Sequence, residues 1–227
     1  MSRYFRGSTL VLLEPGATVA IERREIGALD VAWSNDGERL AVLVSRDGLK
    51  SVQILRADLV LESEFDIALM EEPFLDTFAT SWAPADDRIA VSVDATCFGI
   101  HPEGYIIDLG AGTSTFFALY SMYFVSESTI VGSLPPESGS TQPVDTMFRV
   151  YLFDLDGDRL GAKRYVSGAV YVAASCPIAG VFAVRSATSV LDRLAGRSPL
   201  QLRSASLASV RFPQTVSGCN SVALMPR

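Results

Sequence analysis

The 227-residue chain has a single histidine and three cysteines, and these two shortages limit its chemistry. One histidine, His101, excludes a metal site built from several histidines. The cysteines Cys97, Cys176 and Cys219 are odd in number and widely spaced, which argues against a disulfide framework and is typical of a reducing compartment. We therefore expect a cytoplasmic protein that has no metal site and no other cofactor.

The sequence also lacks long apolar runs and an excess of basic residues. The run TLVLL near the N-terminus is shorter than the apolar core of a signal peptide and leads directly into Glu14 and Pro15. No stretch approaches the roughly 18 apolar residues of a membrane span. The formal net charge is −7 and the pI is about 4.8, whereas proteins that bind nucleic acid usually carry a basic face. We expect neither nucleic acid nor a membrane among the partners.

The most informative stretch is LDVAWSNDGERLAVLV at 29–44, which contains a strand, a tight turn and a second strand. Apolar and polar residues alternate up to Trp33, and Asn35, Asp36 and Gly37 tolerate the positive φ that a hairpin turn requires. This pattern predicts a β-hairpin with a buried tryptophan.

Weaker copies of the hairpin recur along the chain. Taking the tryptophan as the reference position, the equivalent residues lie 42 to 50 positions apart, at Trp33, Trp82, Phe124, Ala174 and Leu224. A period in the forties, with about four short strands in each unit, is typical of β-propeller blades.

Four complete units, each with strands A to D, are expected at 29–67, 80–119, 121–166 and 170–212. The D strand of the third unit is expected at 159–166 and that of the fourth at 208–212. One strand at 220–225 and three strands at 3–6, 8–14 and 18–24 remain, and together they would form one more blade from both ends of the chain. Such closure removes exposed sheet edges. The sequence therefore predicts an all-β fold, a five-bladed β-propeller, in a single domain over 1–227.

Two of these hairpins resemble a known repeat. In the first hairpin the resemblance is carried by Trp33, Ser34, Asp36, Gly37, Arg39, Leu40 and Ala41. In the second it is carried by Trp82, Pro84, Asp86, Arg88, Ile89 and Ala90, and Asp87 is assigned to the position of the repeat's glycine. The pattern resembles the WD40-like (PD40) repeats of bacterial propellers related to TolB. The Gly-His and Trp-Asp dipeptides of true WD40 blades are absent. The resemblance implies a propeller fold and no particular activity.

The expected connections differ in length between the two ends of the propeller. The longest are 65–76, 94–103, 133–145 and 185–198, and all of them are D-to-A or B-to-C connections, which open on the same face. Long loops in a compact domain are uncommon unless they bind something or are disordered. We call this face the long-loop face and expect it to be the functional one.

Apolar residues alternate with acidic ones in the first of these connections. Leu69, Met70, Phe74 and Leu75 are interleaved with carboxylates that include Asp76, and exposed apolar residues of this kind indicate a contact surface for a protein partner. An equally good interpretation is that they tuck under the neighbouring blade. His101 and Glu103, in the next connection, would complete the partner-binding set.

Carboxylates at the mouth of the central channel offer a different function. The repeat places Asp30 and Asp76 there, and five-bladed propellers include glycoside hydrolases with carboxylates at this location, so Asp76 or Asp30 could act as base or nucleophile and Glu103 as acid. The alternative is that Asp30 caps its strand and Asp76 is a solvated loop end. No Gly-x-Ser-x-Gly motif is present to make His101 part of a serine hydrolase site.

Two other motifs have a structural explanation. DLDGD at 154–158 resembles part of a calcium loop but falls where a hairpin turn is already required. GAGTS at 110–114 leads into a strand, so it lacks the helix N-terminus that binds phosphate.

The leading hypothesis is a non-catalytic protein-binding or scaffolding propeller. The alternatives are a glycosidase-like hydrolase or lyase, and a subunit of a larger complex.

Overall fold

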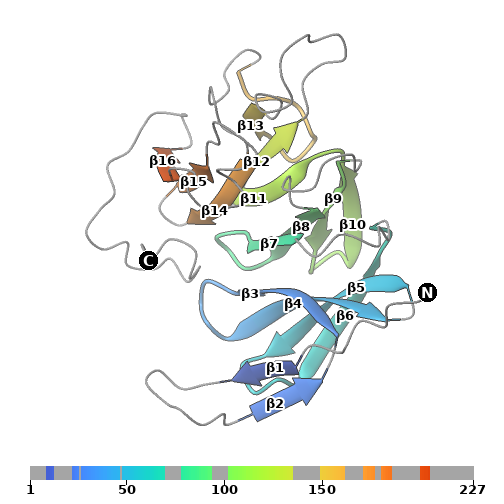
Figure 1. The fold of residues 1–227 in the computed structure, drawn as a ribbon. Coiled ribbons are helices and arrows are strands. Elements are labelled where there is room, and N and C mark those ends of the chain that lie inside the picture. The colour runs from blue at the N-terminus through green and yellow to red at the C-terminus, as the bar shows by residue number, and fades with distance from the viewer. Residues whose placement is uncertain are drawn as a thin grey trace, which may run out of the picture.

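The computed structural model is an all-β protein (Figure 1). It describes residues 9–12, 22–25, 27–46, 48–69, 78–93, 102–134, 149–161, 171–176, 180–185 and 200–204. Within these ranges the chain forms sixteen strands and no helix, and consequently no helical span suited to a membrane.

The strands form consecutive antiparallel sheets in which neighbours along the chain pair with each other. Blade 1 consists of β3 (Ala28–Trp33), β4 (Arg39–Arg46), β5 (Leu49–Arg56) and β6 (Leu61–Ile67). Blade 2 consists of β7 (Phe78–Trp82), β8 (Arg88–Val93), β9 (Gly104–Asp108) and β10 (Thr113–Phe117). Both match the four strands expected from the sequence.

Blades 3 and 4 each have three described strands. Blade 3 contains β11 (Tyr120–Ser126), β12 (Thr129–Leu134) and β13 (Arg149–Phe153), and blade 4 contains β14 (Tyr171–Cys176), β15 (Val181–Arg185) and β16 (Leu200–Ser204). Of the expected fourth strand of blade 3, Arg159 forms a single bridge to Phe153. The expected fourth strand of blade 4, at 208–212, lies outside the described residues.

A two-stranded sheet of β1 (Thr9–Leu12) and β2 (Glu22–Glu25) lies beside blade 1 (Figure 1). Leu10 packs against a cluster on blade 1 that includes Leu40, Val42 and Leu55. The predicted remaining strands of the closing blade, 3–6 and 220–225, lie outside the described residues. The fold is therefore propeller-like, and the count of five blades stays a prediction.

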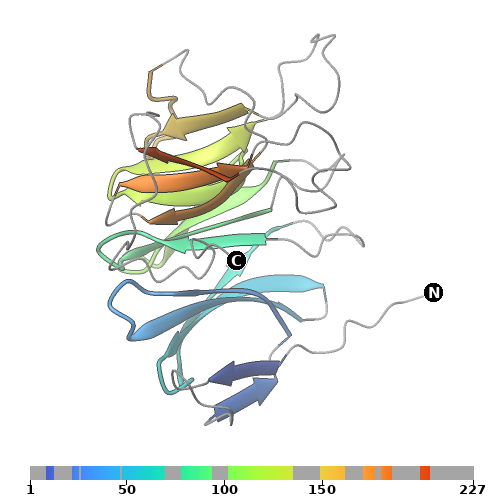
Figure 2. The same cartoon turned by 60° about the vertical axis from the view of Figure 1, so that its left-hand side comes forward.

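Apolar side chains fill the spaces between successive blades, so the sheets stack face to face (Figure 2). Alternate residues of a strand point to opposite faces: in β4, Ala41 and Leu43 face blade 2, whereas Leu40 and Val42 face the sheet of β1 and β2. The innermost strands β3, β7, β11 and β14 contact one another in that order. This arrangement places the A strands around a common centre, as the repeat predicts.

The structure corrects the alignment of the two hairpin turns. Trp33 pairs with Leu40 and Trp82 pairs with Ile89, so the residue equivalent to Gly37 is Asp86 and the assignment of Asp87 to the glycine place is wrong. Both residues have positive φ, 77° and 56° respectively. Asp is one of the few non-glycine residues that adopt this conformation readily, which explains how an aspartate replaces the glycine.

Candidate functional site

The candidate site is the end of the propeller that carries the long connections. Among the connections left by the strand bounds, 68–77, 94–103, 135–148 and 186–199 are long and join strand ends at this end of the propeller. The connection 154–170 between β13 and β14 is longer still, but it begins with the hairpin turn at 154–158 and includes the place of the expected fourth strand of blade 3. The opposite end has only short hairpin turns in blades 1 and 2, at 34–38, 57–60, 83–87 and 109–112. Two connections at the long-loop end are also short, 47–48 and 118–119.

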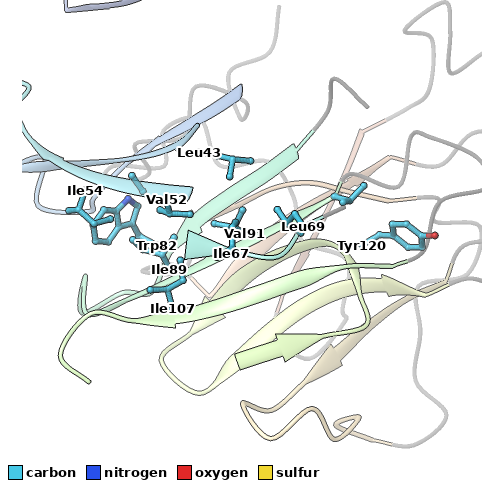
Figure 3. Packing of buried hydrophobic residues seen from close by; sticks show 12 residues of the cluster. Leu43, Val52, Ile54, Ile67, Leu69, Trp82, Ile89, Val91, Ile107 and Tyr120 are labelled. Atoms are coloured by element: carbon cyan, nitrogen blue, oxygen red, sulfur yellow. The ribbon is translucent and has the colours of Figure 1, made fainter. Parts of the chain in front are cut away.

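Leu69, near the start of the connection between blades 1 and 2, is a core residue. Its side chain is 5 % exposed and belongs to the cluster between these blades, which also contains Tyr120 (Figure 3). Leu69 is therefore not part of an exposed contact surface, and for this residue the alternative interpretation, burial beneath the neighbouring blade, is correct. The other residues predicted for this contact surface lie outside the described residues: Met70, Phe74, Leu75 and Asp76. The same is true of His101 in the next connection.

Lys50 fixes the start of the same connection. Its side chain is buried, and Nζ donates a hydrogen bond of 3.1 Å to the carbonyl oxygen of Leu69. A buried ammonium group is costly unless it is hydrogen-bonded. Lys50 was not among the predicted site residues, although its place two and four positions before Val52 and Ile54 in β5 indicates that the three side chains share the inward face.

Glu103 ends the connection between β8 and β9. It is buried, and its carbonyl oxygen accepts a hydrogen bond from the backbone N–H of Val93 at 2.9 Å. Two tyrosines lie within the influence of its negative charge. The pKa of Tyr105 is raised mainly by burial and further by the charge of Glu103. The same two causes raise the pKa of Tyr120 to about 12. Both phenols are therefore protonated at neutral pH, and the hydroxyl of Tyr120 points away from the aliphatic residues of its cluster (Figure 3).

The predicted carboxylate site is only partly described. Asp30 is half-buried on β3 next to a register shift, and Glu103 lies on the second blade. Asp76 lies outside the described residues. The use of these three carboxylates as a catalytic set stays a prediction.

The acidic turn at 154–158 has the structure of a hairpin turn. Oδ1 of Asp154 accepts hydrogen bonds from the backbone N–H groups of Asp156 and Asp158, at 3.1 and 2.8 Å, and Gly157 has a φ of 91°. The carboxylate thus stabilises the local backbone. Within the described ranges, no three potential metal ligands are grouped together.

No protein-family model and no curated protein matches the chain. Solved structures resemble its fold. An uncharacterised protein from Listeria monocytogenes superposes with a TM-score of 0.52 at 11% identity, over 82% of this chain and 52% of its own. TolB from Acinetobacter baumannii gives 0.51 at 11% identity, over 82% and 43%. Acylaminoacyl peptidase from Pyrococcus horikoshii gives 0.53 at 12% identity, over 83% and 32%.

These similarities show the fold, which is a β-propeller like that of TolB. They do not carry an activity, because function depends on sites and not on the fold. The chain spans about half or less of the length of the proteins it resembles.

Proposed function

We propose that the protein binds a protein partner through its long-loop end and performs no chemistry of its own. The observation that carries the proposal is the concentration of long connections at one end of a sheet framework whose opposite end has short turns. Binding residues are commonly found on loops held by a rigid scaffold. Lys50 and Glu103 supply such a scaffold, because they are buried where the connections 68–77 and 94–103 meet the blades.

The test compares apolar residues from the two ends of the propeller. One variant changes Met70, Phe74 and Leu75 to alanine, and the matched control changes Val60 and Leu61, which are 48% and 41% exposed at the short-turn end of blade 1. Partners are identified by affinity purification of the wild-type chain from its native cell and mass spectrometry.

We expect the first variant to lose at least tenfold in affinity for the purified partner, while the control binds as the wild type does. Circular dichroism checks that both are folded. Equal binding by all three proteins would contradict the proposal.

A hydrolase or lyase is the second candidate function, and its motive is Glu103, a buried residue at the long-loop end whose negative charge acts on Tyr105 and Tyr120. Hydrolysis of aryl glycosides by the wild type that is lost in Glu103→Gln would support this function. A wild type without any turnover would remove it.

The third possibility is that the chain works as part of a larger protein or complex. The motive is that the chain covers only about half or less of the length of the similar proteins. The native mass of the purified material distinguishes it from an independent propeller. Cytoplasmic location also stays a prediction.

A further inference from the structure

Among the residues that the structure describes, the outermost strand of blade 2 forms an open sheet edge. β10 is the last strand of its sheet, and Thr113, Ser114, Thr115 and Phe116 are all exposed. Phe116 is 53% exposed, and its ring stacks edge-to-face on Tyr105 with 5.5 Å between ring centroids. Among the described residues, no strand pairs with the outer side of β10.

The corresponding edge of blade 1 is protected by charge. β6 is also an outermost strand, but Glu62, Glu64 and Asp66 alternate along it and are all exposed. Charged side chains on an edge strand prevent pairing with another chain. β10 has no charged residue in its five positions, so this protection is absent from blade 2.

We propose that the free edge of β10 binds β10 of a second copy of this chain. In an antiparallel pair with a two-fold axis at Thr115, each Thr115 lies opposite its own copy, and Ser114 lies opposite Phe116 of the second copy. The two Phe116 rings become diagonal neighbours, within reach of aromatic contact. The contact is isologous and closes at two subunits.

Charge selects this edge over the other one. Pairing of two β6 strands would bring Glu62, Glu64 and Asp66 against the same carboxylates of the second copy, and like charges on facing strands destabilise a sheet. Pairing of two β10 strands brings no charge together. The uncharged β-branched and aromatic residues of β10 also suit a strand partner of the same kind.

The dimer should be weak and should strengthen with salt. Five residues of strand extend about 17 Å, so the contact is smaller than the roughly 1,200–2,000 Å² of a stable interface. Each copy carries a formal net charge of −7, and this repulsion between copies is screened by salt. A basic peptide bound to the same edge would show the opposite salt dependence.

The experiment is sedimentation equilibrium of the full chain between about 5 and 500 μM, in 50 and in 500 mM NaCl. We expect a monomer–dimer equilibrium with more dimer at high salt. Thr115→Lys should weaken it at least tenfold, because two ammonium groups would face each other. Leu61→Lys, an exposed position on β6 that undergoes the same change in charge, should leave it unchanged.

Three results would overturn the proposal: a monomer at every concentration, equal dimerisation of Thr115→Lys and the wild type, or dissociation by salt. The proposal would also be overturned if the wild type were monomeric and bound a different protein that Thr115→Lys no longer binds. The β10 edge would then be the binding site of that partner. Hydrogen exchange of the β10 amides should slow with concentration in the wild type and in Leu61→Lys but not in Thr115→Lys, and this checks that the β10 edge is the one buried.

Discussion

Blades 1 and 2 share their strand order, the spacing of their hairpins and a tryptophan at the end of the innermost strand, yet their turns differ in what they do. In blade 2, the carboxylate of Asp86 accepts hydrogen bonds from the backbone N–H and the side chain of Asn35, both at 2.7 Å, and from the backbone N–H of Asp36 at 3.0 Å. In blade 1 the equivalent Gly37 has no side chain to do this. The difference shows that one copy of the repeat supplies the acceptor that orders the turn of the other.

The faces of the two blades differ as well. Leu43 and Val52 of blade 1 face blade 2 with aliphatic side chains, whereas the equivalent positions of blade 2 are Ser92 and Gly104. The small residues allow β11 to approach closely, and the backbone N–H of Met122 donates to Oγ of Ser92 at 2.7 Å. Both interfaces contain apolar side chains, and the second one adds a hydrogen bond from a backbone N–H to a serine hydroxyl.

The largest effect should separate the two tryptophans. Trp82 is 3 % exposed, donates from Nε1 to the carbonyl oxygen of Ala32 at 2.9 Å and lies 5.1 Å beneath the guanidinium of Arg39. Trp82→Ala should lower the free energy of unfolding by about 3–5 kcal/mol, measured by urea denaturation. Trp33→Ala should cost less, since Trp33 is only half-buried. Equal losses would mean that the two blades depend on their tryptophans alike.

The next effect tests the alignment of the turns. Asp86→Ala removes three hydrogen bonds to the carboxylate and puts alanine, which adopts positive φ less readily than aspartate, at a φ of 56°, so we expect a loss of about 2–3 kcal/mol. Asp87→Ala is the matched control and should stay within about 0.5 kcal/mol, because its contact with Arg88 is at the surface. A larger loss of stability for Asp87→Ala than for Asp86→Ala would indicate that Asp87, and not Asp86, is the equivalent of Gly37.

A third substitution tests the close approach of β11. A β-carbon at Gly104 would lie 2.3 Å from Sδ of Met122 and 3.1 Å from Cβ of Ser92. Gly104→Ala should therefore destabilise the protein by about 1–3 kcal/mol in thermal and urea unfolding. Adding Met122→Ala to this variant should recover part of the loss if the clash is the cause. A neutral Gly104→Ala would contradict this and would show that the Met122 side chain or β11 moves away at little cost.

The smallest effect concerns pH and the turn of blade 1. A hydrogen bond of 2.6 Å from the hydroxyl of Ser34 lowers the pKa of Asp36, with a further contribution from the backbone N–H of Glu38. A carboxyl group with a lowered pKa stabilises the fold above its unfolded pKa and loses this contribution as the pH falls through the folded value. Asp36→Asn should cost about 0.5 kcal/mol or less at pH 7, because the group is exposed. In urea titrations from pH 7 to pH 2 this difference should disappear at the acid end; a constant difference would contradict it.

The sequence predicted the blades well because their signal is local. Alternation of apolar residues and the turn residues at 35–37 and 154–158 act within a few positions, so the eight strands of blades 1 and 2 could be assigned without a structure. The site was harder to predict. The position of Leu69 was left open between exposure and burial, because an apolar residue in an acidic loop has the same sequence pattern in both cases. The burial of Lys50 was missed because lysine side chains are mostly exposed.

The sequence by itself determined the all-β class, the hairpins, the repeat and the uneven lengths of the connections, since each follows from residue periodicity and spacing along the chain. Only the tertiary structure decided which residues serve the neighbouring blade. Two examples are the ordering of the turn at Asn35 by Asp86 and the burial of Lys50 and Glu103. They depend on residues about ten to fifty positions apart, or on burial by other strands. Contacts of this kind follow from the packing of one sheet on the next, which a local pattern does not encode.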